Sequence, residues 1–167
     1  MTSLQRIIGM PVVGNGKTLG FVERGVLSKS GKRLQGLVIR RGLGSARWVP
    51  RRAISMIGSA CVLVCGEATH LPKEPEVRLT RVFLTSGESA GMVTDALIHG
   101  ETFQVTALEV SDGPLYRLLG RKAYATAYRL RPEESADGGD TLAFEIITSG
   151  LHSWVGLPEN QRKGEEG

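Results

Sequence analysis

Two glycine-marked heptapeptides decide the organisation of the chain: Gly16-Lys17-Thr18-Leu19-Gly20-Phe21-Val22 and, 71 positions later, Gly87-Glu88-Ser89-Ala90-Gly91-Met92-Val93. The same offset continues through three further apolar pairs, in which Val26 matches Leu97, Leu34 matches Val105 and Leu37 matches Leu108. Glycines match in place and apolar residues match in type, as two copies of one small fold require. The sequence therefore predicts two similar units in tandem.

Each copy has the pattern of β structure. Short apolar runs alternate with glycine-containing turns, in the first copy at residues 11–13, 19–27, 34–39, 48–49 and 60–64. Residues 29–32 are typical of a hairpin turn, Gly25 indicates a bulge, and a short helical turn is expected at residues 51–55 after Pro50. About five or six short strands cannot bury both faces of an open sheet, so closure into a small barrel is predicted for each copy.

The predicted fold class is mainly all-β, with two tandem small β-barrels and short helical turns. The first domain spans residues 1–72 and the second, more divergent domain spans residues 77–155. The proline-bracketed, charged residues 73–76 form the expected linker between them. Residues 156–167 have almost no apolar content and are expected to form a disordered tail.

Five segments of the first copy carry a family pattern: Ile8-Gly9-Met10-Pro11-Val12-Val13, Gly16-Lys17-Thr18-Leu19-Gly20-Phe21-Val22-Glu23, Leu34-Gln35-Gly36-Leu37-Val38-Ile39, Trp48-Val49-Pro50-Arg51-Arg52-Ala53-Ile54 and Ile57-Gly58-Ser59-Ala60-Cys61-Val62-Leu63. Residues 4–65 resemble the PRC-barrel domain, and residues 77–150 resemble a second copy without the Val-Pro step. The resemblance implies a six-stranded barrel, as in the photosynthetic reaction-centre H subunit and the C-terminal domain of the ribosome maturation factor RimM. It also implies protein–protein docking, with no shared catalytic residues.

Two short motifs suggest enzymatic chemistry, and their context argues against it. Gly16-Lys17-Thr18 lacks the earlier glycine of a phosphate-binding loop, since Pro11 stands there, and strand-like residues follow it in place of a helix. Ser89 lies in a Gly-x-Ser-x-Gly motif that is also followed by strand-like residues, whereas a nucleophile elbow needs a helix. The repeat places Ser89 on Thr18, so both motifs are predicted to be the same hairpin turn.

Other candidate sites and targeting signals give equally little support for an enzyme or a membrane-spanning protein. The histidines, His70, His99 and His152, lie far apart without ligands at metal spacing, so neither a metal site nor a cofactor is expected. The first nine residues lack the apolar region of a signal peptide, and no segment is long and apolar enough to span a bilayer. Cys61 and Cys65 lack a zinc or redox spacing and are predicted to be buried, reduced thiols of a cytoplasmic protein.

The net charge of +4 conceals a strong asymmetry between the two copies. Residues 1–72 contain 11 basic and 2 acidic residues, a net charge of +9, whereas residues 73–167 contain 10 and 15, a net charge of −5. The two copies are therefore expected to attract one another, within one chain or head-to-tail between chains as a homo-oligomer.

The candidate binding residues form a basic cluster around one tryptophan: Arg40, Arg41, Arg47, Trp48, Arg51 and Arg52. Such a cluster suits an acidic protein, RNA or anionic lipid headgroups; the alternative is a solvated rim whose arginine stems cover apolar edges. With nine aromatic residues in the chain, a base-stacking platform for single-stranded nucleic acid is less expected. The leading hypothesis is a non-enzymatic cytoplasmic adaptor that docks an acidic protein, with arginines for steering and Trp48 as an anchor. An RNA- or ribosome-associated protein is the alternative.

Overall fold

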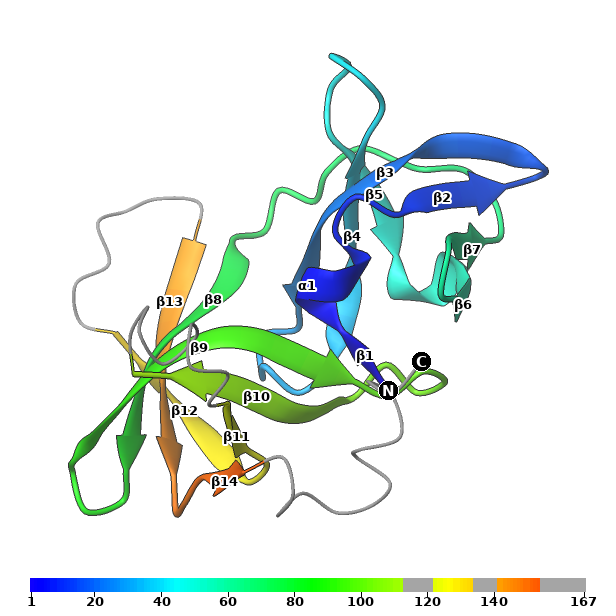
Figure 1. Cartoon of the computed structure of the whole chain (residues 1–167). Helices are drawn as coiled ribbons and strands as arrows, with labels where there is room; N and C mark the ends of the chain where they lie inside the picture. The colour runs from blue at the N-terminus through cyan, green and yellow to red at the C-terminus, as the bar shows by residue number, and fades with distance from the viewer. Residues whose placement is uncertain (113–121, 134–140, 154–167) are drawn as a thin grey trace.

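The computed structural model describes residues 1–112, 122–133 and 141–153, and within them the chain is mostly β (Figure 1). The predicted all-β class is confirmed. The helical turn expected after Pro50 is the 3-10 helix η1 (Arg51–Ala53), but a helix at the N-terminus, α1 (Leu4–Ile7), was not predicted. Ser3 caps α1 by accepting a hydrogen bond from the Arg6 amide on its Oγ at 3.2 Å. The expected tail, residues 156–167, lies outside the described residues.

The strands of the first half (residues 1–72) are β1 (Thr2–Ser3), β2 (Pro11–Gly14), β3 (Lys17–Leu27), β4 (Leu34–Arg40), β5 (Arg47–Pro50), β6 (Ile54–Ile57) and β7 (Val62–Val64). Those of the second half (residues 73–153) are β8 (Glu76–Leu84), β9 (Ser89–Ile98), β10 (Val105–Ser111), β11 (Ala123–Ala125), β12 (Tyr128–Pro132), β13 (Thr141–Thr148) and β14 (His152–Ser153).

The two halves have the same strand order, as two copies of one small fold would have. In the first half the order is β5-β4-β3-β2-β7-β6, and in the second it is β11-β10-β9-β8-β13-β12. Each half contains one parallel pair, β2 with β7 and β8 with β13, and its other pairs are antiparallel. Val12 of the first parallel pair and Val82 of the second are both fully buried. The repeat therefore specifies connectivity as well as composition.

The repeated glycines occupy places where a side chain would not fit or would be strained. A Cβ added to Gly20 would lie 2.9 Å from the carbonyl oxygen of Arg40, and one added to Gly91 would lie 2.5 Å from that of Ser111. Arg40 and Ser111 are themselves related by the repeat. Gly87 has a φ of +91° in the β8–β9 turn and Ser89 then opens β9, so the hairpin interpretation of this motif is confirmed.

The two halves are joined into one connected mixed sheet. The strand β3 pairs with β8 where Leu27 faces Val77, and β1 pairs with β9, so the N-terminal residues belong to the sheet of the second half. Further backbone bonds run from the Leu34 amide to Phe103 and from the Val105 amide to Lys32, at 2.9 and 2.8 Å. Within the described residues no pairing joins β5 to β6 or β11 to β12, so the sheet is open. The predicted closure of each copy into a small barrel is therefore not seen, because these outer strands do not pair with each other.

Hydrophobic packing also crosses between the halves. The largest buried cluster is built on the first half but includes Ile98 and Phe103 of the second half. Leu4 of α1 packs against this cluster and against the main cluster of the second half. The helix α1 lies between the two halves (Figure 1), and burial of apolar surface there stabilises their arrangement.

The prediction of two buried thiols is wrong. Both cysteines are free, but Cys61 is only half-buried and Cys65 is exposed. The side chains of β7 alternate, and the inward positions belong to Val62 and Val64. Cys65 therefore follows on the outward side of the strand.

Candidate functional site

The five candidate arginines form two groups at opposite ends of β5. In the β4–β5 hairpin, Arg47 faces Ile39 and Pro50 faces Gly36. Arg40, Arg41 and Arg47 therefore lie at the closed end of the hairpin, and we call them the tip arginines. Arg51 and Arg52 lie in η1 beyond the other end of β5, and we call them the η1 arginines. The single basic cluster that the sequence suggested is therefore divided into two separate groups in the structure.

The turn at the tip of the β4–β5 hairpin is held by hydrogen bonds from the backbone and from a side chain. The Gly44 amide donates to the carbonyl of Arg41 at 3.0 Å, and Gly42 adopts a φ of +56° within this turn. The Arg40 guanidinium donates to the Gly44 carbonyl at 2.8 Å and also forms an ion pair with Glu23 at 3.3 Å. The turn holds Leu43 at its apex, where the side chain is fully exposed.

The η1 arginines lead into an exposed apolar face. Arg52 is exposed and Arg51 is half-exposed, and η1 continues directly into β6. On the outer face of β6 and β7, Met56 and Leu63 are cross-strand partners with exposed fractions of 50% and 36%. Apolar residues with a basic margin are typical of a protein docking surface.

Most of the candidate arginines have no acidic partner in the part of the chain that the structure describes. Arg40 forms an ion pair with Glu23, whereas no ion pair to Arg41, Arg47, Arg51 or Arg52 is present there. Arg47 donates to the carbonyl of Ala68, a neutral acceptor that leaves its charge uncompensated. These four cations are therefore available to an anionic partner.

The expectation that Trp48 is an exposed docking anchor is wrong. Its side chain is only 8% exposed and packs with Val26 and Val38. The indole ring lies so close to Gly36 that an added Cβ would overlap it. Trp48 faces inward because a large aromatic residue on a short strand covers the glycine of the neighbouring strand.

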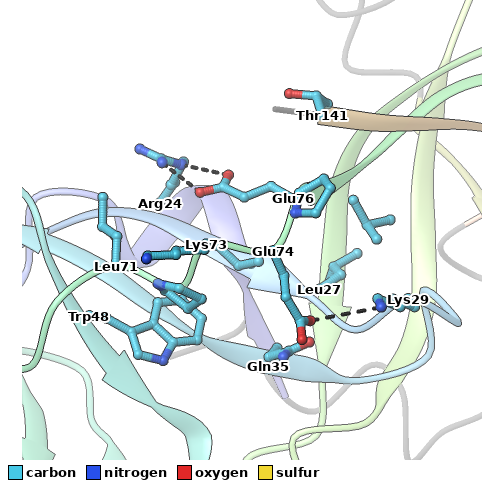
Figure 2. A pocket seen from close by; sticks show the side chains of 14 residues that line it. Arg24, Leu27, Lys29, Gln35, Trp48, Leu71, Lys73, Glu74, Glu76 and Thr141 are labelled. Carbon is cyan, nitrogen blue, oxygen red and sulfur yellow. Dashed lines mark hydrogen bonds and ion pairs between the residues drawn. The ribbon is translucent and has the colours of Figure 1, made fainter. Parts of the chain in front are cut away.

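Trp48 also lines a cleft of about 660 Å³ at the junction of the two halves. Figure 2 shows the connecting residues 71–76 along one side of this cleft. Two ion pairs join this segment to the first half: Arg24 with Glu76, through bonds of 2.9 and 2.6 Å, and Lys29 with Glu74 at 3.8 Å. The hydrogen bond to Glu76 raises the pKa of Arg24. These ion pairs attach the connecting segment to the first half and neutralise the charges of Arg24 and Lys29 in the cleft.

One pair of carboxylates was missed at the sequence level. Asp95 and Glu109 are direct partners across β9 and β10 and line a cavity of about 310 Å³. The sequence spacing of Asp95 and Glu109 does not predict that they pair, because extending the register from Ile98 and Val105 would pair Asp95 with Leu108. The irregularity between Val105 and Ala107 shifts the register by one residue and brings the two acids together.

Both carboxylates already have partners. Ser3 Oγ donates to Asp95, which also accepts from the backbone amides of Gln5 and Ala96 at 3.1 and 2.7 Å. Glu109 accepts from Thr94 Oγ1 at 3.0 Å and forms an ion pair with Lys122 at 3.3 Å. Burial raises the pKa of Asp95, and the charge of Glu109 acts in the same direction. This arrangement attaches the N-terminal segment to β9.

The three histidines, His70, His99 and His152, all lie within the described residues. No group of three potential metal-ligating side chains occurs among residues 1–112, 122–133 and 141–153. His99 accepts hydrogen bonds from the amides of Glu101 and Thr102, both at 3.2 Å, and so orders the β9–β10 turn. In the same residues no helix combines the length and apolar character needed to cross a membrane.

No protein-family model matches the chain, and no curated protein matches it in sequence. The resemblance to the PRC-barrel domain rests on the segments quoted above.

Proposed function

We propose that this protein is a non-enzymatic cytoplasmic adaptor, built from two PRC-barrel-like units, that docks an acidic protein partner on its basic first half. The observation that carries the proposal is the joining of Arg51 and Arg52, without acidic partners in the described residues, to the exposed Met56–Leu63 pair. The arginines would steer an acidic partner into contact, and burial of the apolar pair would hold it there.

The placement of the acidic groups supports docking over catalysis. Asp95 and Glu109 accept hydrogen bonds from their own chain, and the cleft charges Arg24 and Lys29 are paired with Glu76 and Glu74. The hydrogen bonds of Asp95 and Glu109 account for these carboxylates structurally, as parts of the attachment of the N-terminal segment and of the β9–β10 pair. The uncompensated charge instead lies on the outer surface of the first half, where a macromolecule has access.

The test compares an Arg51→Ser/Arg52→Ser variant with an Arg33→Ser/Arg78→Ser control, which removes the same charge from exposed positions elsewhere. Each full-length protein is used to capture partners from an extract of the source organism, and bound proteins are identified by mass spectrometry at low and high salt. We expect an acidic protein to be captured by the wild type and the control, more strongly at low salt, and at least tenfold less by the η1 variant.

A second variant, Leu63→Ser, tests the apolar part of the surface. It should weaken capture at both salt concentrations, because its contribution is not electrostatic. Equal capture by all variants would contradict the proposal. Capture that disappears after ribonuclease treatment would also contradict it and would favour the RNA- or ribosome-associated alternative.

A further inference from the structure

The β4–β5 tip combines an isolated exposed leucine with uncompensated positive charge. Leu43 is fully exposed, and its neighbours in the turn are Arg41, Gly42, Gly44 and Ser45. The side chain is held outward by the backbone bond from Gly44 to Arg41 and by the bond from Arg40 to Gly44, so it does not fold back onto the sheet. An ordered turn thus maintains apolar surface in contact with water.

The charges around the apex match an anionic surface. Arg41 and Arg47 form no ion pair with a carboxylate in the described part of the chain, and Arg40 adds a third guanidinium partly balanced by Glu23. Glu67 lines the same depression as Arg41 and Arg47 but forms no ion pair with either of them in the described residues. The tip therefore carries excess positive charge directly beside its apolar apex.

A lipid surface fits this combination better than a second protein does. Protein interfaces surround a buried anchor with further contacts that exclude water, and the neighbours of Leu43 are glycines, serine and arginines. A bilayer supplies its own apolar medium beneath a layer of phosphates, so a single protruding side chain can be buried without a complementary pocket. The tip loop projects at the top of Figure 1, away from the second half, so the fold does not obstruct the approach to a flat surface.

We infer that the β4–β5 tip is a peripheral membrane contact. Leu43 inserts at the boundary of headgroups and acyl chains, while Arg41 and Arg47 bind lipid phosphates and Arg40 stiffens the turn. The η1 arginines lie beyond the other end of β5 and remain free for a protein partner. This inference does not depend on the proposed docking function, because it concerns a different end of the hairpin and a different ligand.

The experiment measures co-sedimentation of the purified full-length protein with vesicles of phosphatidylcholine, with or without about one-third phosphatidylserine. The wild type should bind the anionic vesicles, more strongly at low salt, and should not bind pure phosphatidylcholine. Leu43→Ser should lower the partition coefficient about tenfold. Arg41→Ser/Arg47→Ser should lower it by about twenty-five-fold, since each cation near the surface contributes about fivefold.

Two matched controls distinguish this contact from nonspecific binding to vesicles. Leu63→Ser removes an exposed leucine of the same half, and Arg33→Ser/Arg78→Ser removes the same number of charges from elsewhere. Leu63→Ser should bind vesicles like the wild type, and the arginine control should retain most of the binding. Glu67→Gln should increase vesicle binding about twofold, because it removes a negative charge beside the tip that repels the anionic lipids.

Insertion is read out separately with a Leu43→Trp variant. Its emission should shift to shorter wavelength on anionic vesicles, relative to the wild-type protein treated in the same way, as the indole leaves water. Binding that depends on Arg41 and Arg47 but not on Leu43, with no emission shift, would overturn insertion. Loss of protein capture by the tip variants with vesicle binding unchanged would assign the tip to a protein partner and overturn the inference.

Discussion

Asp95 on β9 and Glu109 on β10 face each other directly across two antiparallel strands, although like charges in this arrangement are destabilising. The structure compensates each one separately, Asp95 with hydrogen bonds from the N-terminal segment and Glu109 with Thr94 and Lys122. The pair therefore couples the attachment of the N-terminus to the protonation of a single aspartate.

Asp95→Asn should stabilise the protein near neutral pH. Burial raises the pKa of Asp95 in the folded state above the ordinary value of about 3.9, so the folded state binds the proton more tightly than the unfolded chain. This contribution to stability is fully present below the ordinary value and is lost as the pH rises through the folded pKa. The melting temperature of the variant should exceed that of the wild type at pH 7, and the difference should shrink as the pH falls towards 4. A difference that grows on acidification would contradict this assignment.

The pKa of Asp95 should fall when the charge opposite it is removed. Glu109→Gln keeps the length of the side chain and an acceptor for Thr94, but it removes the carboxylate that disfavours ionisation of Asp95. The fall should be partial, because burial is the larger cause. Side-chain NMR titration of both proteins measures it, and an unchanged pKa would mean that the two acids do not interact.

Gly91→Ala should be among the most destabilising single changes, by about 3 kcal/mol. The added methyl group would lie 2.5 Å from the Ser111 carbonyl at a φ of +120°, whereas Gly20→Ala would meet the Arg40 carbonyl at 2.9 Å and should lose about 2 kcal/mol. Gly87→Ala is the control for backbone strain alone, since its added methyl meets nothing within 4 Å despite a φ of +91°. Chemical denaturation should rank the losses in the order Gly91, Gly20, Gly87, and any other order would contradict the close-approach explanation.

Tyr128→Phe should lower the free energy of unfolding by about 1 to 2 kcal/mol. The phenol of Tyr128 donates to the buried Gly31 carbonyl at 2.8 Å, and Lys32 lies over its ring with its Nζ 3.1 Å from the centroid. Burial raises the pKa of the phenol, so it remains a donor throughout the neutral range. Thr18→Val removes an exposed hydroxyl and should change stability by less than about 0.5 kcal/mol in the same denaturation experiment. Equal effects of the two changes would show that the Tyr128 bond contributes nothing to joining the halves.

The ion pair between Arg24 and Glu76 should have a small, salt-dependent coupling energy. The two side chains remain 42% and 35% exposed, so water screens the pair despite its two hydrogen bonds. A double-mutant cycle with Arg24→Met and Glu76→Gln should give about 0.5 to 1 kcal/mol at low salt and less at high salt. A coupling that salt does not alter would indicate that the pair is shielded from solvent.

The sequence predicted the strands and their glycine turns because both depend on local chemistry, whereas the predicted closure into barrels, which depends on pairing between distant strands, is not seen. The offset between Gly20 and Gly91 reports close backbone approaches that exclude any side chain, and the apolar runs mark strands whatever their partners. The same residues gave no indication that Trp48 faces inward, because its orientation depends on a glycine of the neighbouring strand. The carboxylate pair depends on a one-residue shift in register, and such a shift leaves no mark in the spacing of Asp95 and Glu109.

The grouping of the arginines on the surface also could not be predicted from the sequence. Five of them fall within a short stretch of sequence, but β5 separates Arg47 from Arg51 and sends the two groups to different ends of a hairpin. Charge density along a chain therefore overstates charge density in space whenever a strand intervenes. The isolated position of Leu43 became interpretable only when the turn around it was known.

The pairing of β1 with β9 has a consequence for the order in which the protein is made. Thr2 faces Ile98, which follows it by 96 positions, so β1 finds its partner only after β9 has been synthesised. Until then Ser3 lacks Asp95 and Leu4 lacks the core of the second half. The first half can begin to fold during translation, but β1 and α1 are completed only when β9 is present, so a bulky group attached next to β1 would interfere with this late step.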